Sequence, residues 1–277
     1  MPDRSNLIYC YDGSFDGLLC CVFESYEKHE IPADILSPDT EQTVLLPQRE
    51  IVTDPKKSAR VLASIPGKMG MEALDFVRRA YLTCLPRKEL YILLFLRIGF
   101  SRGPRVMNML ADDVVNTLFK AVKHLTNEAH LLKGFLRFSV FDGALAAEIE
   151  PKNLVLPLLA PHFRERYPEE RFLIYDRTHS MALIYQPYRS KIISADDFQM
   201  PEPDEEERSF RELWRLFYST IEVRGRHNPK CRMSHMPKRY WNCMTEFSTE
   251  KNPRKKQELP GGRKLLNGSG SESSGPK

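Results

Sequence analysis

Apolar positions in the first half of the chain recur mainly at helical spacing. Residues 6–11 form a short apolar, strand-like run, and beyond the turn at 12–14 apolar residues recur at helical spacing as far as Tyr26. Residues 33–53 then hold short strand-like pieces, such as 43–46 and 50–53. The helical spacing then returns and predicts further helices at about 54–65, 70–83, 89–100 and 112–126.

The pattern changes near residue 130. Residues 134–141 alternate between apolar and polar, which predicts a strand, and Asp142-Gly143 is a strong signal for a hairpin that returns as a second strand at 145–150. A helix at 154–167 and strands at 171–176, 181–186 and 191–194 would complete a ββαβββ order. We therefore predict an α+β fold, in which an antiparallel sheet with a helix on one face packs with the helical N-terminal half.

Changes in composition divide the chain into segments. An acidic linker at 201–207 leads into a helix with an apolar stripe formed by Phe210, Leu213, Trp214, Phe217 and Ile221. The last residues are rich in Lys, Gly, Ser and Pro, as disordered tails are. We expect a mostly helical part at 1–130, an antiparallel α+β part at 131–200, a C-terminal helix and basic segment at 201–250 in the same globular unit, and a disordered tail at 251–277.

The composition of the chain indicates the cellular compartment in which the protein works and the cofactors it could bind. The chain has 277 residues, of which 42% are hydrophobic and 28% charged, and it contains no uncharged apolar run of about 18 residues that could span a bilayer. Its N-terminus lacks a basic start followed by an apolar stretch, and its six cysteines include no Cys-x-x-Cys pair. We therefore expect a cytoplasmic protein with free thiols, without a metal site or another cofactor, and without membrane contact.

Charge is distributed unevenly along the chain. Residues 223–277 hold 13 Lys/Arg and 4 Asp/Glu, a net charge of +9, whereas residues 1–222 hold 28 against 33, a net charge of −5. A basic end on an acidic body indicates an anionic partner. The basic residues before the tail are Arg224, Arg226, Lys230, Arg232, Lys238 and Arg239, and they are interleaved with His227, His235, Tyr240 and Trp241.

This basic and aromatic segment suits nucleic acid with accessible bases. Lys and Arg bind phosphates, and exposed aromatic rings stack on unpaired bases, so we expect Tyr240 or Trp241 to stack. A nucleotide or another phosphorylated small molecule would fit the same chemistry. In a purely structural alternative, the apolar residues of the segment pack on the sheet and the charges are only solvated.

The turn at Asp12 is a second candidate site. It lies between a predicted strand and a predicted helix, where a carboxylate could act as a general base or could simply cap the helix. An enzyme would need a closed pocket in which Asp12 and His235 approach each other. The sequence contains no complete catalytic motif, so it leaves open whether the protein is an enzyme.

Two stretches resemble a known family. They are Tyr11-Asp-Gly-Ser-Phe-Asp-Gly-Leu-Leu-Cys and the stretch from Leu213 that ends in Met-Pro-Lys-Arg-Tyr-Trp at 236–241. Over residues 5–247 the chain resembles a bacterial family of uncharacterised "probable DNA metabolism" proteins. In that family the domain is encoded beside a radical-SAM protein assigned to DNA modification or repair, and is sometimes fused to a uracil-DNA glycosylase-like domain.

The resemblance implies a role in DNA repair, and three functions follow as expectations. The first is a DNA-binding accessory protein that positions single-stranded or damaged DNA for a radical-SAM partner. The second is an enzyme that acts on a nucleobase or nucleotide, glycosylase-like or hydrolytic, with Asp12 or His235 as acid or base. The third is a docking module that binds the partner protein without touching DNA.

Overall fold

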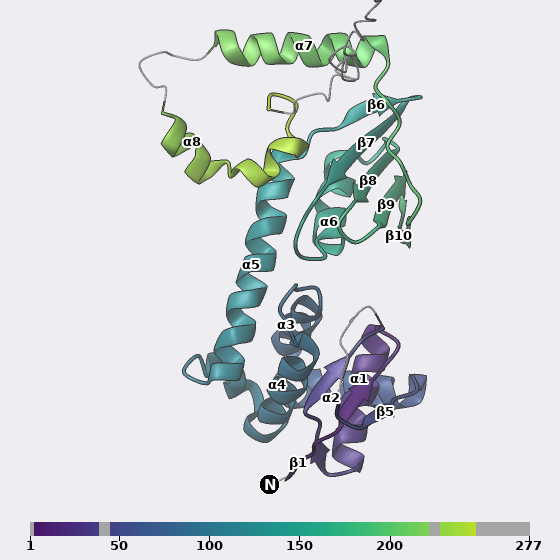
Figure 1. The fold of residues 1–277 in the computed structure, drawn as a ribbon, viewed down its shortest axis with the longest axis vertical. Coiled ribbons are helices and arrows are strands. Elements are labelled where there is room, and N and C mark those ends of the chain that lie inside the picture. Colours follow the sequence, from purple (N-terminus) through teal and green to yellow (C-terminus); the bar gives the residue numbers. More distant parts are fainter. Residues whose placement is uncertain (1–2, 39–44, 222–227, 248–277) are drawn as a thin grey trace, which may run out of the picture.

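The computed structural model describes residues 3–38, 45–221 and 228–247. Its buried apolar side chains form separate core clusters in two lobes. The long helix α5 (Asp113–Phe135) joins these lobes, as Figure 1 shows. The predicted tail at 251–277 and residues 222–227 lie outside the described residues. Within the described residues, no helix has the length and apolar character needed to cross a bilayer.

The first lobe contains a parallel sheet in the order β4-β2-β5. Its strands are β2 (Ile8–Cys10), β4 (Asp34–Leu36) and β5 (Gln48–Glu50), and α1 (Phe15–Glu27) follows β2. A separate parallel pair joins β1 (Asp3–Arg4) to β3 (Glu30–Ile31).

The predicted strand at 6–11 and the helix after it are confirmed, but the strand predicted at 50–53 is wrong. Beyond Glu50 the chain leaves the sheet for the next helix, and β5 lies earlier, at 48–50. The strand β4 lies within the range 33–53 where short strands are expected, but its position there was not predicted. Residues 45–46 form no strand, and the rest of the piece predicted at 43–46 lies outside the described residues. Residues 34–36 and 48–50 are strands because they pair with β2, where Ile8 lies opposite both Asp34 and Gln48. The local composition of these residues does not reveal this pairing.

Further helices follow this small sheet in the sequence. They are α2 (Pro55–Met69), α3 (Met71–Tyr81) and α4 (Lys88–Arg102), followed by the 3-10 helix η1 (Gly103–Asn108). All three predicted α-helices are confirmed, and Asp54 caps α2 by accepting a hydrogen bond from the Lys56 amide. The helix α2 continues past its predicted end at 65, because the buried side chain of Met69 fills the space beside Gly99.

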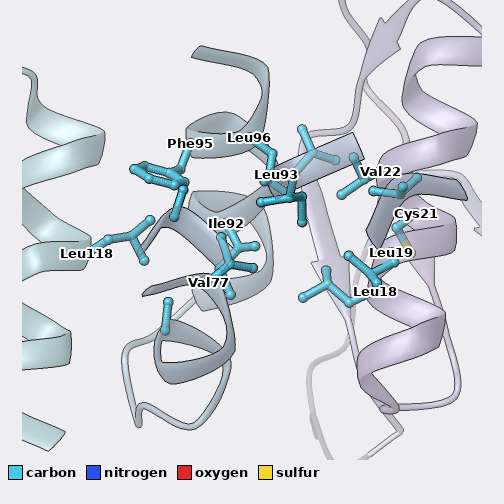
Figure 2. Close-up of a cluster of buried hydrophobic side chains, with 14 of the residues drawn as sticks. Leu18, Leu19, Cys21, Val22, Val77, Ile92, Leu93, Phe95, Leu96 and Leu118 are labelled. Atoms are coloured by element: carbon cyan, nitrogen blue, oxygen red, sulfur yellow. The ribbon is translucent and has the colours of Figure 1, made fainter. Parts of the chain in front are cut away.

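The core of the first lobe lies between α1 and α4. Figure 2 shows Leu18, Leu19 and Val22 of α1 facing the side chains of α4, among them Leu93 and Leu96. All five of these residues are fully buried. Removing this much apolar surface from water is the main driving force for packing α4 onto the N-terminal part of the chain.

The second lobe holds a mixed sheet in the order β10-β9-β8-β7-β6, with α6 (Leu156–Arg166) as the crossover helix. Its strands are β6 (Ser139–Phe141), β7 (Ala144–Ile149), β8 (Phe172–Asp176), β9 (Met181–Gln186) and β10 (Arg189–Ser194).

The α+β class and the ββαβββ order are confirmed for this lobe. The prediction that the sheet is antiparallel is wrong for one pair of neighbouring strands. The strands β7 and β8 are parallel because α6 returns the chain to the same end of the sheet, and the other neighbouring strands are antiparallel. The predicted hairpin at 142–143 is also confirmed. Asp142 and Gly143 both have positive φ, 47° and 70°, as a tight hairpin turn requires.

The prediction of a strand over 134–141 is wrong for most of its length. The helix α5 continues through Phe135, and only 139–141 pair with β7. Buried Leu125, Leu132 and Leu136 keep the helical spacing of the preceding turns. Burial of this stripe in the second lobe outweighs the local alternation, since tertiary packing overrides propensity.

Beyond the sheet, the chain forms α7 (Glu205–Thr220), α8 (Pro229–His235) and the 3-10 helix η3 (Lys238–Cys243). The predicted helix after the acidic linker is confirmed, and Asp204 caps it by accepting from the Glu207 amide. No residue of α7 is buried, so its apolar stripe faces solvent. Polar contacts hold it in place, among them the hydrogen bond from Arg211 to the Ser139 hydroxyl.

Candidate nucleic-acid interface

The basic and aromatic segment lies against the end of α5 that enters the second lobe, and α8 projects away from it (Figure 1). Asn228 caps α8 by accepting a hydrogen bond from the Cys231 amide, and Pro229 occupies its first turn. Lys230 and His235 are exposed on this helix. The other predicted contacts in this region, Arg224, Arg226 and His227, lie outside the described residues.

Trp241 is the centre of a cluster of rings and cations. Its ring stacks on Phe247 with 4.6 Å between centroids, and its indole N–H donates to the Met236 carbonyl oxygen at 2.9 Å. The guanidinium of Arg232 lies 5.8 Å from the Trp241 ring and 5.3 Å from the Phe247 ring, and the Lys238 ammonium lies 5.7 Å from Trp241. We call Trp241, Phe247, Arg232 and Lys238 the Trp241 cluster.

The Trp241 cluster combines positive charge with flat rings at the surface. Trp241 and Phe247 are each half-buried, and Lys238 is exposed. Arg232 is partly buried, and its Nε has no hydrogen-bond partner among the described residues. A Lys or Arg side chain beside an aromatic ring packs its apolar stem against the protein while its charged end can still bind an anion.

Arg239 and Tyr240 occupy a different environment from the Trp241 cluster. The Arg239 guanidinium lies 3.3 Å from a carboxylate oxygen of the buried Glu128 in α5, and it also donates to the Tyr240 hydroxyl. Tyr240 is only 3% exposed and its ring lies 5.7 Å from that of Phe135. Burial raises the pKa of Tyr240. The ring therefore has no free face on which a base could stack, and of the two predicted stacking residues only Trp241 reaches solvent.

Glu128 connects three parts of the second lobe. Besides the contact with Arg239, its carboxylate accepts hydrogen bonds from the amides of Lys152 and Asn153 and from the Asn153 side chain at 2.6 Å. We call Glu128, Asn153 and Arg239 the Glu128 clasp. Sequence reasoning missed it, because Glu128 follows the predicted end of its helix and lies far in sequence from Arg239. The Lys-Arg-Tyr-Trp stretch thus contains both surface and structural residues.

Asp12 lies two residues after the end of β2 and begins the turn into α1. Its Oδ1 accepts from the Ser14 amide at 3.0 Å and the Ser14 hydroxyl at 2.7 Å, and its Oδ2 accepts from the Thr53 hydroxyl at 2.8 Å. The hydrogen bond from the Ser14 side chain holds the pKa of Asp12 below its ordinary value. A carboxylate with a lowered pKa is a weak general base at neutral pH, but it is a stable acceptor for hydrogen bonds. Ser14, rather than Asp12, caps α1 by accepting from Gly17.

Asp12 and His235 do not share a pocket. Asp12 lies at the start of α1 in the first lobe, whereas His235 ends α8 beside the second lobe, and Figure 1 shows these helices at distant parts of the molecule. The expectation that the two residues form a catalytic acid/base pair is therefore wrong. Within the described residues, no group of at least three His, Cys, Asp or Glu side chains is arranged to hold a metal ion.

Comparison with family models gives one match. Residues 86–246 match DUF4130, a domain of unknown function. The chain belongs to this family. The DUF4130 match starts just before α4 and contains the Glu128 clasp, all of α7 and the Trp241 cluster except Phe247. Comparison with the curated proteins finds no match.

Proposed function

We propose that this DUF4130 protein is a nucleic-acid-binding accessory protein and that the Trp241 cluster, with Lys230, is its contact surface. The observation that carries the proposal is the half-buried Trp241 ring, which stacks on Phe247 and has the cations of Arg232 and Lys238 5.8 and 5.7 Å from its centroid. Cations neutralise phosphates, and a partly exposed indole offers a stacking platform for an unpaired base. The match to residues 86–246 includes almost all of this surface.

DNA is the polyanion that the resemblance favours, single-stranded or damaged, with a radical-SAM protein as the enzyme that acts on it. The support is the likeness of the Asp12 turn and of the Met-Pro-Lys-Arg-Tyr-Trp stretch to the "probable DNA metabolism" proteins. The separation of Asp12 from His235 removes the acid/base pair that a nucleobase enzyme would have used. An accessory role requires no such pair.

Fluorescence anisotropy with labelled single-stranded, duplex and uracil-containing DNA tests the proposal. Titrations at about 50 mM and about 200 mM salt give the salt dependence of the binding constant. Lys230→Ala with Lys238→Ala should reduce the logarithmic salt slope for single strands by about 1.4, because each lost phosphate contact removes about 0.7. Trp241→Leu should weaken binding to single strands more than to duplex DNA, because only unpaired bases stack.

A matched control comes from α5. Lys120 and Lys123 are also exposed lysines, and replacing both by alanine removes the same charge away from the Trp241 cluster. This control variant should keep the salt slope of the unmodified protein. Binding that ignores salt, or equal losses in the two double variants, would refute the proposed surface.

The apolar stripe of α7 supports a second candidate function, docking of the radical-SAM partner. Phe210, Leu213, Phe217 and Ile221 are 60%, 59%, 51% and 57% exposed and lie along one face of the helix. Contiguous exposed apolar side chains mark interaction sites, and this stripe lies within the residues matched to DUF4130. We propose that the partner covers this stripe.

Co-purification with the radical-SAM protein tests the docking role. Leu213→Ser with Phe217→Ser should abolish co-purification while leaving DNA binding intact, because no residue of α7 is buried in the isolated chain. Glu206→Ala with Glu212→Ala serves as the control on the same helix. If the partner is still retained by the serine variant, the stripe is not its docking site.

A further inference from the structure

The carboxyl ends of three parallel strands meet at one edge of the first lobe. The strand β2 lies between β4 and β5, so the chain moves from β2 to β4 on one side and then to β5 on the other. The end of β2 is therefore a point where the strand order reverses. In open α/β sheets, ligands bind in the crevice outside the carboxyl ends of the strands at such points.

A cavity of about 810 Å³ lies at this edge. Its walls come from the segments that follow all three strands, 10–12 after β2, 36–38 after β4 and 48–53 around β5. The volume falls within the range of about 300 to 1,000 Å³ that is typical of small-molecule sites. We call it the β2-end pocket.

The charged side chains of the β2-end pocket are carboxylates, which accept hydrogen bonds, and Ser37 and Gln48 add neutral polar groups. Asp12 and Glu50 line it, together with the hydroxyl of Thr53, and no Lys or Arg is among the described residues that line it. A phosphate would therefore meet two carboxylates without a counter-charge. A neutral ligand with O–H or N–H donors fits this lining better than an anion does.

The local backbone is shaped to present Asp12. A Cβ added at Gly17 would lie 2.2 Å from the Asp12 carboxylate and 2.9 Å from the Thr53 hydroxyl, so only glycine lets both side chains lie against α1. Ser14 and Thr53 fill three of the roughly four acceptor positions of the carboxylate, and one remains for a ligand. The lowered pKa of Asp12 keeps that acceptor ionised at neutral pH.

Apolar side chains form the remaining walls of the pocket. Leu36, Pro38, Ile51 and Val52 line it, and Val52 is 77% exposed. Such walls suit a flat organic ring more than a metal ion or a simple sugar, because apolar surface gains from contact with a ring. A few polar groups among apolar walls are the usual composition of a small-molecule site.

We propose that the β2-end pocket binds a nucleoside without its phosphate. The sugar hydroxyls donate to Asp12 and Glu50, and the base packs on Leu36, Pro38 and Val52. This site is separate from the Trp241 cluster and lies before the residues that match DUF4130. The inference does not depend on the nucleic-acid surface proposed above.

Isothermal titration calorimetry on the full chain tests the proposal, with adenosine, uridine, their 5′-monophosphates and the diamine putrescine as probes. At least one nucleoside should bind, and its monophosphate should bind more weakly. Asp12→Asn and Glu50→Gln should each weaken nucleoside binding about tenfold or more, because each removes a hydrogen bond to a charged group. Asp16→Asn removes the same charge from an exposed position of α1 outside the pocket lining and should leave binding unchanged.

Several results would overturn the assignment. They are the absence of binding by either nucleoside, equal or tighter binding of the monophosphates, binding of putrescine alone, and full affinity in both pocket variants. Glu50 is exposed, so Glu50→Gln keeps the test decisive even if Asp12→Asn disturbs the turn. Loss of DNA binding in the lysine variants at α8 and η3 would leave this result unaffected, so the two proposals can fail separately.

Discussion

Replacing Arg239 by alanine should lower stability while leaving most nucleic-acid binding intact, and replacing its neighbour Lys238 should do the reverse. The two residues are adjacent in sequence and equal in charge. Arg239 faces the buried carboxylate of Glu128, whereas Lys238 lies beside the half-buried ring of Trp241. Comparing the two variants therefore distinguishes the structural role of the Glu128 clasp from the binding role proposed for the Trp241 cluster, using two neighbouring residues of η3.

The loss of stability expected for Arg239→Ala depends on how exposed the side chains of Arg239 and Glu128 are. The Glu128 side chain is 2% exposed, but that of Arg239 is 47% exposed, so solvent screens the pair. The contact is an ion pair with one exposed partner, and its removal should cost about 1 kcal/mol in Arg239→Ala. For a chain of this size that corresponds to a fall in Tm of about 2–4 °C.

Truncation of Glu128 should cost more. Glu128→Ala leaves the amides of Lys152 and Asn153 and the Asn153 side chain without their acceptor, and it leaves a cavity next to α5. Breaking a buried charged network of this kind costs about 3 to 5 kcal/mol. Lys238→Ala, in contrast, changes an exposed side chain and should stay within about 0.5 kcal/mol.

Urea unfolding followed by circular dichroism measures these differences, and anisotropy with single-stranded DNA measures binding on the same samples. A double-mutant cycle between Arg239→Ala and Glu128→Gln isolates the coupling between the two side chains. The reasoning fails if Arg239→Ala leaves the unfolding free energy unchanged and weakens DNA binding more than Lys238→Ala does. Arg239 would then be a phosphate contact and not part of a clasp.

Further predictions concern the first lobe and α6. Gly17→Ala should destabilise by about 1–3 kcal/mol in urea unfolding through overpacking against Asp12, whereas Gly67→Ala in α2, with open space around it, should stabilise by about 0.5–1 kcal/mol. Because the pKa of Asp12 is lowered in the folded protein, its ionised carboxylate stabilises the fold above about pH 4. Below that pH the free energy of unfolding should fall, and it should fall less in Asp12→Asn. Burial lowers the pKa of His162, so stability should fall with acidification below about pH 6.5, and less in His162→Leu.

Local signals in the sequence predict those parts of the fold that depend on neighbouring residues. Asp54 before Pro55 marks the start of α2, and Asp142-Gly143 marks the hairpin, because caps and tight turns are decided within a few residues. The positions of β4 and β5 could not be predicted from the local sequence, because these residues are strands only through their pairing with β2. For the same reason the end of α5 at Phe135 depends on packing in the second lobe and not on the local pattern.

The candidate site divides in the same way. Composition draws attention to residues 223–247, but it cannot tell Lys238 from Arg239, because the difference is the position of Glu128 in a distant helix. The turn at Asp12 is identifiable as a strand-to-helix turn in the sequence. Its pocket is not, since the walls also come from segments after β4 and around β5 that only the parallel register brings together.

The boundary of the DUF4130 match does not coincide with a structural boundary. The match begins at residue 86, yet the buried face of α4 packs on Leu18 and Val22 of α1, which precede it (Figure 2). The helix α5 then contributes Leu118 to the first core and Leu132 to the second. In this chain the residues before 86 therefore supply most of the buried core on which α4 rests. Because one continuous helix enters both cores, the β2-end pocket and the Trp241 cluster are parts of one connected fold.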